Sequence, residues 1–214
     1  MSNNTLTKLW KSEYAAKDIQ AAEEDFSNGA LDGGALSSIY YTVATKKRAE
    51  GDQRGYKKYL ERATKISDSF IHERSMLGPD EIDVRQSILR EAGRADEALS
   101  AIEEGLKKAG LATHTKALLL AGEAEALFAT QGKKAEKRIK NIMKGVEESV
   151  QTIAEESPLQ AIRVYRALAR YAKRVNNRSG LSRFVRKAQA LIDAHGAKDQ
   201  ERKLTFDLKE KSST

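Results

Sequence analysis

The chain has 214 residues and a formal net charge of +7, with 32% charged and 6% aromatic residues. This length allows a single domain with a sizeable core. The sequence contains no cysteine, which excludes disulfides, catalysis by a thiolate and cysteine metal ligands. Valine and isoleucine occur singly rather than in alternating runs, so the sequence does not predict strands.

Apolar runs are short throughout the sequence. The longest, residues 117–121, is far too short to cross a bilayer. The first residues lack the apolar segment of a secretory signal. We therefore expect a cytoplasmic protein without membrane insertion.

The first predicted element is a long helix over about residues 3–28, with Trp10 as an anchor into the core or a capping element. Three glycines in residues 27–36 then end it. Apolar residues at three- and four-residue spacing follow in pairs of segments. They predict helical hairpins over about residues 35–70, 79–110, 112–155 and 157–195. Residues 197–214 are polar and rich in lysine, and we expect a frayed tail with one turn around Leu204 and Phe206.

The turns of these hairpins recur at a nearly constant interval of 39 to 44 residues, at Gly51, Gly93, Gly132 and Asn176. Two helices per period are typical of an α-solenoid, in which each unit buries its apolar face against its neighbours. We expect one all-α domain over residues 1–196.

The units resemble tetratricopeptide repeats (TPRs), which pair two helices in about 34 residues. The resemblance covers roughly residues 37–192. It is strongest in spacing in the fourth unit, at Tyr165, Leu168, Ala169, Ala172, Leu181, Val185 and Ala188. The period is longer than usual, and Lys137 stands where a small residue is typical. The resemblance implies a right-handed TPR-like α-solenoid of about four helical hairpins with an N-terminal helix, whose first helices line a concave groove.

Charge is unevenly distributed: residues 1–106 carry a net charge of −4 and residues 107–214 a net charge of +11. Residues 157–192 contain no Asp or Glu. Five cations of the fourth unit take groove positions in the TPR-like frame, and we call them the basic stripe: Arg163, Arg166, Arg170, Lys173 and Arg174. Arginine presents a fork that suits carboxylates and phosphates.

This pattern has two interpretations. The stripe is either a groove that binds an external anion, or a face that is solvated or paired with acidic residues of neighbouring units, such as Glu123, Glu125, Glu155 and Glu156. If it binds an anion, an acidic protein or peptide is favoured, because few aromatic residues are available for base stacking. Nucleic acid is the alternative, aided by a secondary basic cluster of Lys133, Lys134, Lys137, Arg138 and Lys140.

The sequence offers no catalytic residue set, metal site or cofactor motif. His72, His114 and His195 lie far apart, each near a helix end or a connection, and no phosphate-binding glycine loop follows a strand. We therefore expect a non-catalytic adaptor or scaffold whose basic groove captures an acidic partner. Self-association of the chain as a homo-oligomer is a further alternative. Reversal of Arg166 and Arg170 to Glu is expected to abolish partner binding without changing the melting temperature.

Overall fold

The computed structural model describes residues 14–73, 79–108 and 110–209, and this part of the chain is helical, without strands. It divides into two compact units, Met1–Ala92 and Gly93–Thr214. The boundary falls at the predicted turn of the 79–110 hairpin. The prediction of one repeat domain over residues 1–196 stays a prediction. Trp10 and residues 3–13 of the predicted first helix lie outside the described residues, and α2 (Ala16–Ser27) forms its later part.

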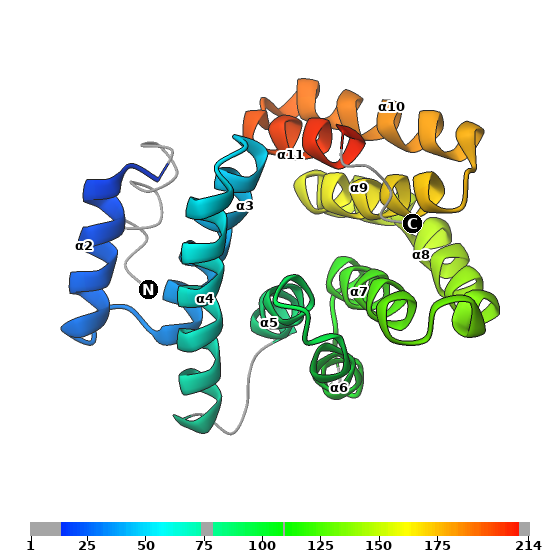
Figure 1. Ribbon diagram of the computed structural model, residues 1–214. Coiled ribbons are helices and arrows are strands. Elements are labelled where there is room, and N and C mark those ends of the chain that lie inside the picture. Colours follow the sequence, from blue (N-terminus) through cyan, green and yellow to red (C-terminus); the bar gives the residue numbers. More distant parts are fainter. Residues whose placement is uncertain (1–13, 74–78, 109, 210–214) are drawn as a thin grey trace. The chain divides into compact units, whose positions relative to one another are not determined.

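Unit 1 contains four described helices: α2 (Ala16–Ser27), α3 (Gly33–Ala49), α4 (Gln53–Glu73) and α5 (Pro79–Glu91) (Figure 1). The α3–α4 pair is the hairpin predicted over residues 35–70, and its apolar side chains, including Val43, Leu60 and Ala63, are buried. The Asp32 side chain caps α3 by accepting a hydrogen bond from the Ala35 amide at 2.8 Å. The helix break predicted in residues 27–36 lies between α2 and α3, and Gly33 already begins α3. Its backbone runs against the Phe70 ring, since a Cβ there would lie 3.0 Å from it.

Two glutamates fasten the flanking helices of unit 1 to the α3–α4 hairpin. Glu23 of α2 accepts hydrogen bonds from the Tyr40 hydroxyl at 2.8 Å and from Arg62 at 2.7 Å. Glu91 of α5 accepts one from the Tyr56 hydroxyl at 2.7 Å and another from Arg48. In both cases the arginine also lies over the ring of the same tyrosine, so charge and ring contact act together.

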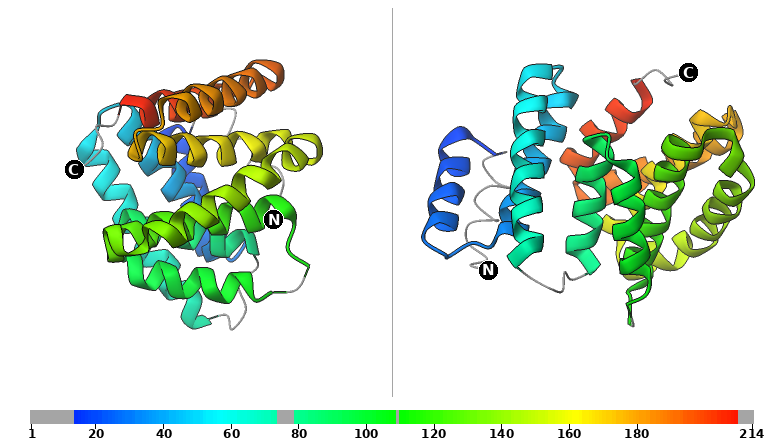
Figure 2. Two further views of the ribbon diagram at one scale, coloured as in Figure 1. Left: turned by 90° about the vertical axis from the view of Figure 1, so that its right-hand side faces the viewer. Right: turned by 60° about the horizontal axis from the view of Figure 1, so that its bottom comes forward.

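Unit 2 contains six described α-helices and a short 3₁₀ turn, η1 (Gly132–Ala135). The α-helices are α6 (Ala95–Leu106), α7 (Thr113–Gln131), α8 (Glu136–Glu156), α9 (Pro158–Arg174), α10 (Arg178–His195) and α11 (Lys198–Lys209). From α6 to α11, each helix packs against the next one in the chain, and α9 also contacts α7 and α11 (Figure 2). One apolar core extends through this unit, with Ile153, Leu168 and Ile192 among its buried residues.

The predicted turns coincide with backbone that bends into positive φ. Gly51, Gly93 and Gly132 have φ of 84°, 79° and 55°, and Asn176 has φ of 55°. Glycine and asparagine are the residues that tolerate this region best. At the start of α10, Asn177 accepts a hydrogen bond from the Gly180 amide at 3.0 Å. Asn176 thus forms the turn, and Asn177 caps the helix that follows it.

The end of the chain differs from the prediction of a frayed tail. Residues 198–209 form α11, which packs on α9 and α10. Gly196, with φ of 62°, ends α10 in the left-handed conformation and redirects the chain. Leu204 and Asp207 are only 2% and 6% exposed, so one side of this polar segment is buried.

Candidate functional site

The basic stripe lies on α9, which begins with proline in its first turn, where a missing N–H costs nothing. The opposite side of the helix is apolar and buried, with Tyr165, Leu168 and Ala172 in the core of unit 2. That burial fixes the rotation of α9 about its axis. The stripe residues are therefore held on the side of α9 that also meets α11 and α7.

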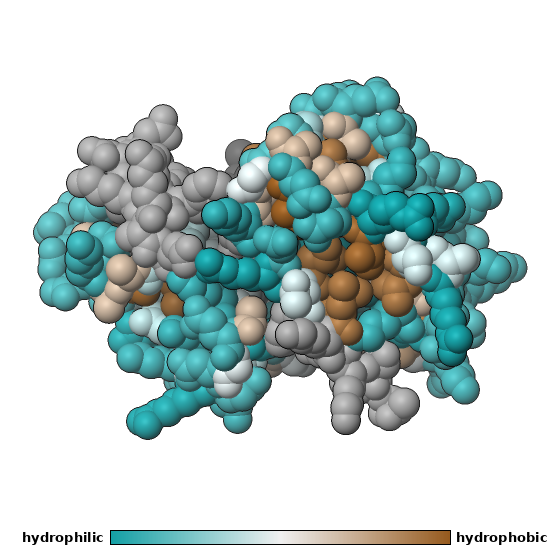
Figure 3. Space-filling model, turned by 90° about the horizontal axis from the view of Figure 1, so that it is seen from above, coloured by the Kyte–Doolittle hydropathy of each residue, from teal (hydrophilic) through white to brown (hydrophobic). Residues whose placement is uncertain are grey.

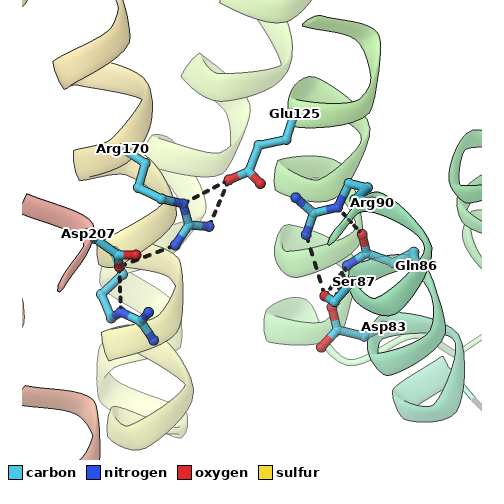
Figure 4. Close-up of polar contacts among 8 residues, drawn as sticks. Asp83, Gln86, Ser87, Arg90, Glu125, Arg170 and Asp207 are labelled. Atoms are coloured by element: carbon cyan, nitrogen blue, oxygen red, sulfur yellow. Dashed lines mark hydrogen bonds and ion pairs between the residues drawn. The ribbon is translucent and has the colours of Figure 1, made fainter. Parts of the chain in front are cut away.

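Asp207 of α11 lies between two arginines of the stripe. Its Oδ2 accepts a hydrogen bond from Arg166 Nε at 2.8 Å and one from Arg170 Nη1 at 3.3 Å. Arg170 also donates to Glu125 Oε1 of α7 from Nε at 3.0 Å and from Nη2 at 2.7 Å. Figure 4 shows Arg170 reaching from α9 to both carboxylates. One guanidinium thus links three helices of unit 2.

Two further contacts fasten α11 to the stripe. Arg166 Nη1 donates to Gln200 Oε1 at 2.9 Å. Lys173 Nζ donates to the backbone carbonyls of Asp207 at 3.2 Å and Leu208 at 2.9 Å. The last carbonyls of a helix have no partner within the helix, and a cation there also complements the helix dipole. Lys173 therefore caps the carboxyl end of α11.

The electrostatics of this network are set by burial. The Arg166 side chain is 13% exposed and the Asp207 side chain 4% exposed. Desolvation lowers the pKa of the Arg166 guanidinium, and the charge of Asp207 opposes that shift. Arg166 and Arg170 bind the carboxylates of Asp207 and Glu125, whereas Lys173 binds backbone carbonyls at the end of α11.

The two ends of the stripe have different contacts. Arg163 donates to Gln160 Oε1 of its own helix at 3.0 Å. The Arg174 guanidinium carbon lies 4.3 Å from the centre of the Phe128 ring of α7. Phe128 is 40% exposed, so this stacked pair lies at the surface. The structure thus brings all five stripe residues onto one helix and joins three of them to α11.

The secondary basic cluster lies on η1 and the first turns of α8, where Lys133, Lys134, Lys137 and Lys140 are exposed. Its arginine, Arg138, is paired with Glu123 of α7. The exposure of Lys137 explains why this position departs from the small residue of the TPR-like pattern. The cluster is separate from the Asp207 network, because none of its members takes part in those contacts.

Sequence reasoning named Glu125 as a partner of the stripe in one of its two interpretations, but it missed Gln200 and Asp207. A signal was present: Gln200, Leu204 and Asp207 stand at positions i, i+4 and i+7, which share one side of a helix. Among the described residues, no group of three or more His, Asp or Glu side chains could hold a metal ion. No helix in this same part of the chain is long and apolar enough to cross a membrane.

One face of unit 2 also carries apolar surface. Figure 3 looks down on the face formed by α10 and α11, where apolar side chains gather between polar ones. Leu181, Val185 and Leu191 of α10 pack against the core while only partly buried, and Leu208 of α11 is 37% exposed.

Comparisons of the chain with protein-family models, with curated proteins and with solved structures gave no match.

Proposed function

We propose that the protein is a non-catalytic adaptor or scaffold, a TPR-like α-solenoid whose basic stripe on α9 binds an acidic segment of a partner protein. The helical hairpins and the positive-φ turns at a nearly constant interval support the repeat architecture. The packing of each helix of unit 2 on the next supports it as well.

One observation carries the choice of ligand: the stripe already holds a helix. Asp207 binds Arg166 and Arg170, and Lys173 caps the end of the same helix. Such charge-assisted contacts are about twice as strong as neutral hydrogen bonds. The basic stripe therefore has the geometry to bind a carboxylate on a partner helix.

The alternative ligand, nucleic acid, is favoured by a different surface. Lys133, Lys134, Lys137 and Lys140 are exposed within ten residues of each other, and lysines in this arrangement bind phosphates without reading sequence. Because the two basic surfaces share no residue, variants of each can be compared directly.

The test is a fluorescence-anisotropy titration with a labelled helical peptide that carries acidic residues on one face and with its Glu→Gln, Asp→Asn twin. A single-stranded and a duplex oligonucleotide are titrated beside them at several salt concentrations. We expect binding of the acidic peptide alone, weakened several-fold by Arg163→Gln with Arg174→Gln and unchanged by Lys137→Gln with Lys140→Gln. If only the oligonucleotides bind, with a steep salt dependence that the lysine variant removes, the protein is a nucleic-acid-binding protein and the proposal is wrong.

A further inference from the structure

Hydrogen bonds and ion pairs make up the described contacts of the basic stripe with α11. Of the α11 side chains that the structure describes, only Leu204 and Asp207 are buried, and α11 exposes Glu201, Arg202 and Thr205. A helix whose role is to close the end of a helical array is expected to bury a continuous apolar side. The grip on α11 instead depends on Arg166, Arg170 and Lys173.

The stripe recognises three features of this helix together. Arg166 binds both Gln200 and Asp207, which are separated by two turns, and Leu204 is buried between them. Lys173 binds the carbonyls of the last turn, which are open only where a helix ends. The recognised pattern is therefore a helix with a carboxylate in its last turn, a leucine three residues earlier and last-turn carbonyls that accept hydrogen bonds from a cation.

We infer that α11 is a built-in competitor for the basic stripe, and that the partner binds by replacing it with a helix of the same pattern. This inference rests on the proposed function and adds its regulation and the form of the partner. The tether supports it: only Gly196 and Ala197 separate α10 from α11. A short tether gives α11 an effective concentration at the stripe of about a millimolar or more. Weak ligands therefore cannot displace α11, and only a ligand that binds the stripe more tightly can.

The test uses the full chain and a fluorescein-labelled peptide of residues 196–209 as the probe. Asp207→Ala in the chain weakens the internal competitor, while the probe keeps its own aspartate. The matched control is Glu201→Ala, an exposed carboxylate of the same helix. A second probe carries the Asp207→Ala change. Circular dichroism and urea unfolding first establish that both variants fold.

We expect the Asp207→Ala chain to bind the probe at least about tenfold more tightly than wild type, because truncating one partner of a buried charge pair weakens binding strongly. The Glu201→Ala chain is expected to bind as wild type does, and the second probe to bind none of them. Equal binding by wild type and Asp207→Ala would overturn the competitor and leave the proposed function standing. No binding by any chain would overturn the competitor, while the titration with the acidic peptide decides the proposed function separately.

A measurement on the unaltered protein makes the test independent of the variant. In amide spectra of isotope-labelled wild type, unlabelled peptide at several millimolar, above the effective concentration of α11, is expected to move the signals of residues 198–209 toward unfolded positions. Signals that stay in place while the peptide binds elsewhere would contradict displacement. Light scattering measures the oligomeric state of the wild type and of Asp207→Ala. A wild-type dimer that becomes a monomer in Asp207→Ala would overturn the proposal, because α11 would then be exchanged between two copies of the chain.

Discussion

Replacement of Asp207 by alanine measures how much the contact between α11 and α9 contributes to stability. Removing one partner of a buried ion pair costs about 3–5 kcal/mol when the remaining charge stays buried. Here Arg166 and Arg170 are 13% and 32% exposed, and Arg170 keeps Glu125. Water and Glu125 therefore compensate part of the loss, and we expect a decrease in the free energy of unfolding of about 2–3 kcal/mol.

The decrease in the free energy of unfolding cannot exceed the cost of releasing α11 from α9. Once α11 is released, water hydrates Arg166 and no buried charge is left unpaired. The assay therefore combines urea unfolding, followed by circular dichroism, with amide hydrogen exchange over residues 198–209. We expect Asp207→Ala to lower the urea midpoint and to speed exchange in α11 most. Glu201→Ala, the control, is expected to change stability by less than about 0.5 kcal/mol. An unchanged midpoint with α11 fully protected in Asp207→Ala would refute the energetic role assigned to this pair.

Three further predictions concern other parts of the chain. Gly145 lies exposed inside α8, and a Cβ added there would meet no neighbouring side chain within 4 Å, so Gly145→Ala is expected to stabilise the protein by about 1 kcal/mol in urea unfolding. Burial, followed by the hydrogen bond to Glu23, raises the pKa of Tyr40 to about 12. Because the folded state holds this proton more tightly than the unfolded state, the associated stability is complete below pH 10, the ordinary pKa of tyrosine, and falls as pH rises toward 12. Tyr40→Phe should make the pH dependence of unfolding flatter by about 1.4 kcal/mol per pH unit there, and an unchanged slope would contradict it. Glu91→Gln removes the charge that binds Arg48 and Tyr56, and we expect a loss of about 1–2 kcal/mol on urea unfolding; no loss would show that Tyr56 and Arg48 find water as readily.

The helices were predictable because their signals are local. Turns need glycine or asparagine where φ is positive, and Gly93 and Asn176 stand where the periodic patterns end. The exception is instructive. Gly33 lies in the segment predicted to break the helix but already begins α3, and its missing Cβ admits Phe70 from α4. That requirement arises between helices, so composition along one segment could not show it.

The charge pattern of α9 was predictable, and Glu125 was named as one possible partner, whereas Asp207 was not. Residues 157–192 lack carboxylates, but Glu125 precedes that stretch and Asp207 follows it, and packing brings both to Arg170. This pairing also replaces one expectation. Reversal of Arg166 and Arg170 to Glu would place carboxylates against Asp207 and Glu125, so the change is expected to destabilise unit 2 as well as affect binding.

The same contacts determine what a partner must add to displace α11. A helix with only the groups of α11 regains the bonds to Arg166, Arg170 and Lys173, so the exchange itself gains nothing and still loses the advantage of the tether. Stripe residues outside the Asp207 network are one source of the additional binding energy. Arg163 and Arg174 lie at the two ends of the stripe, and Arg174 stands beside the exposed ring of Phe128. A partner helix longer than α11, with acidic residues reaching both ends and an apolar residue for Phe128, therefore has the chemistry to replace it.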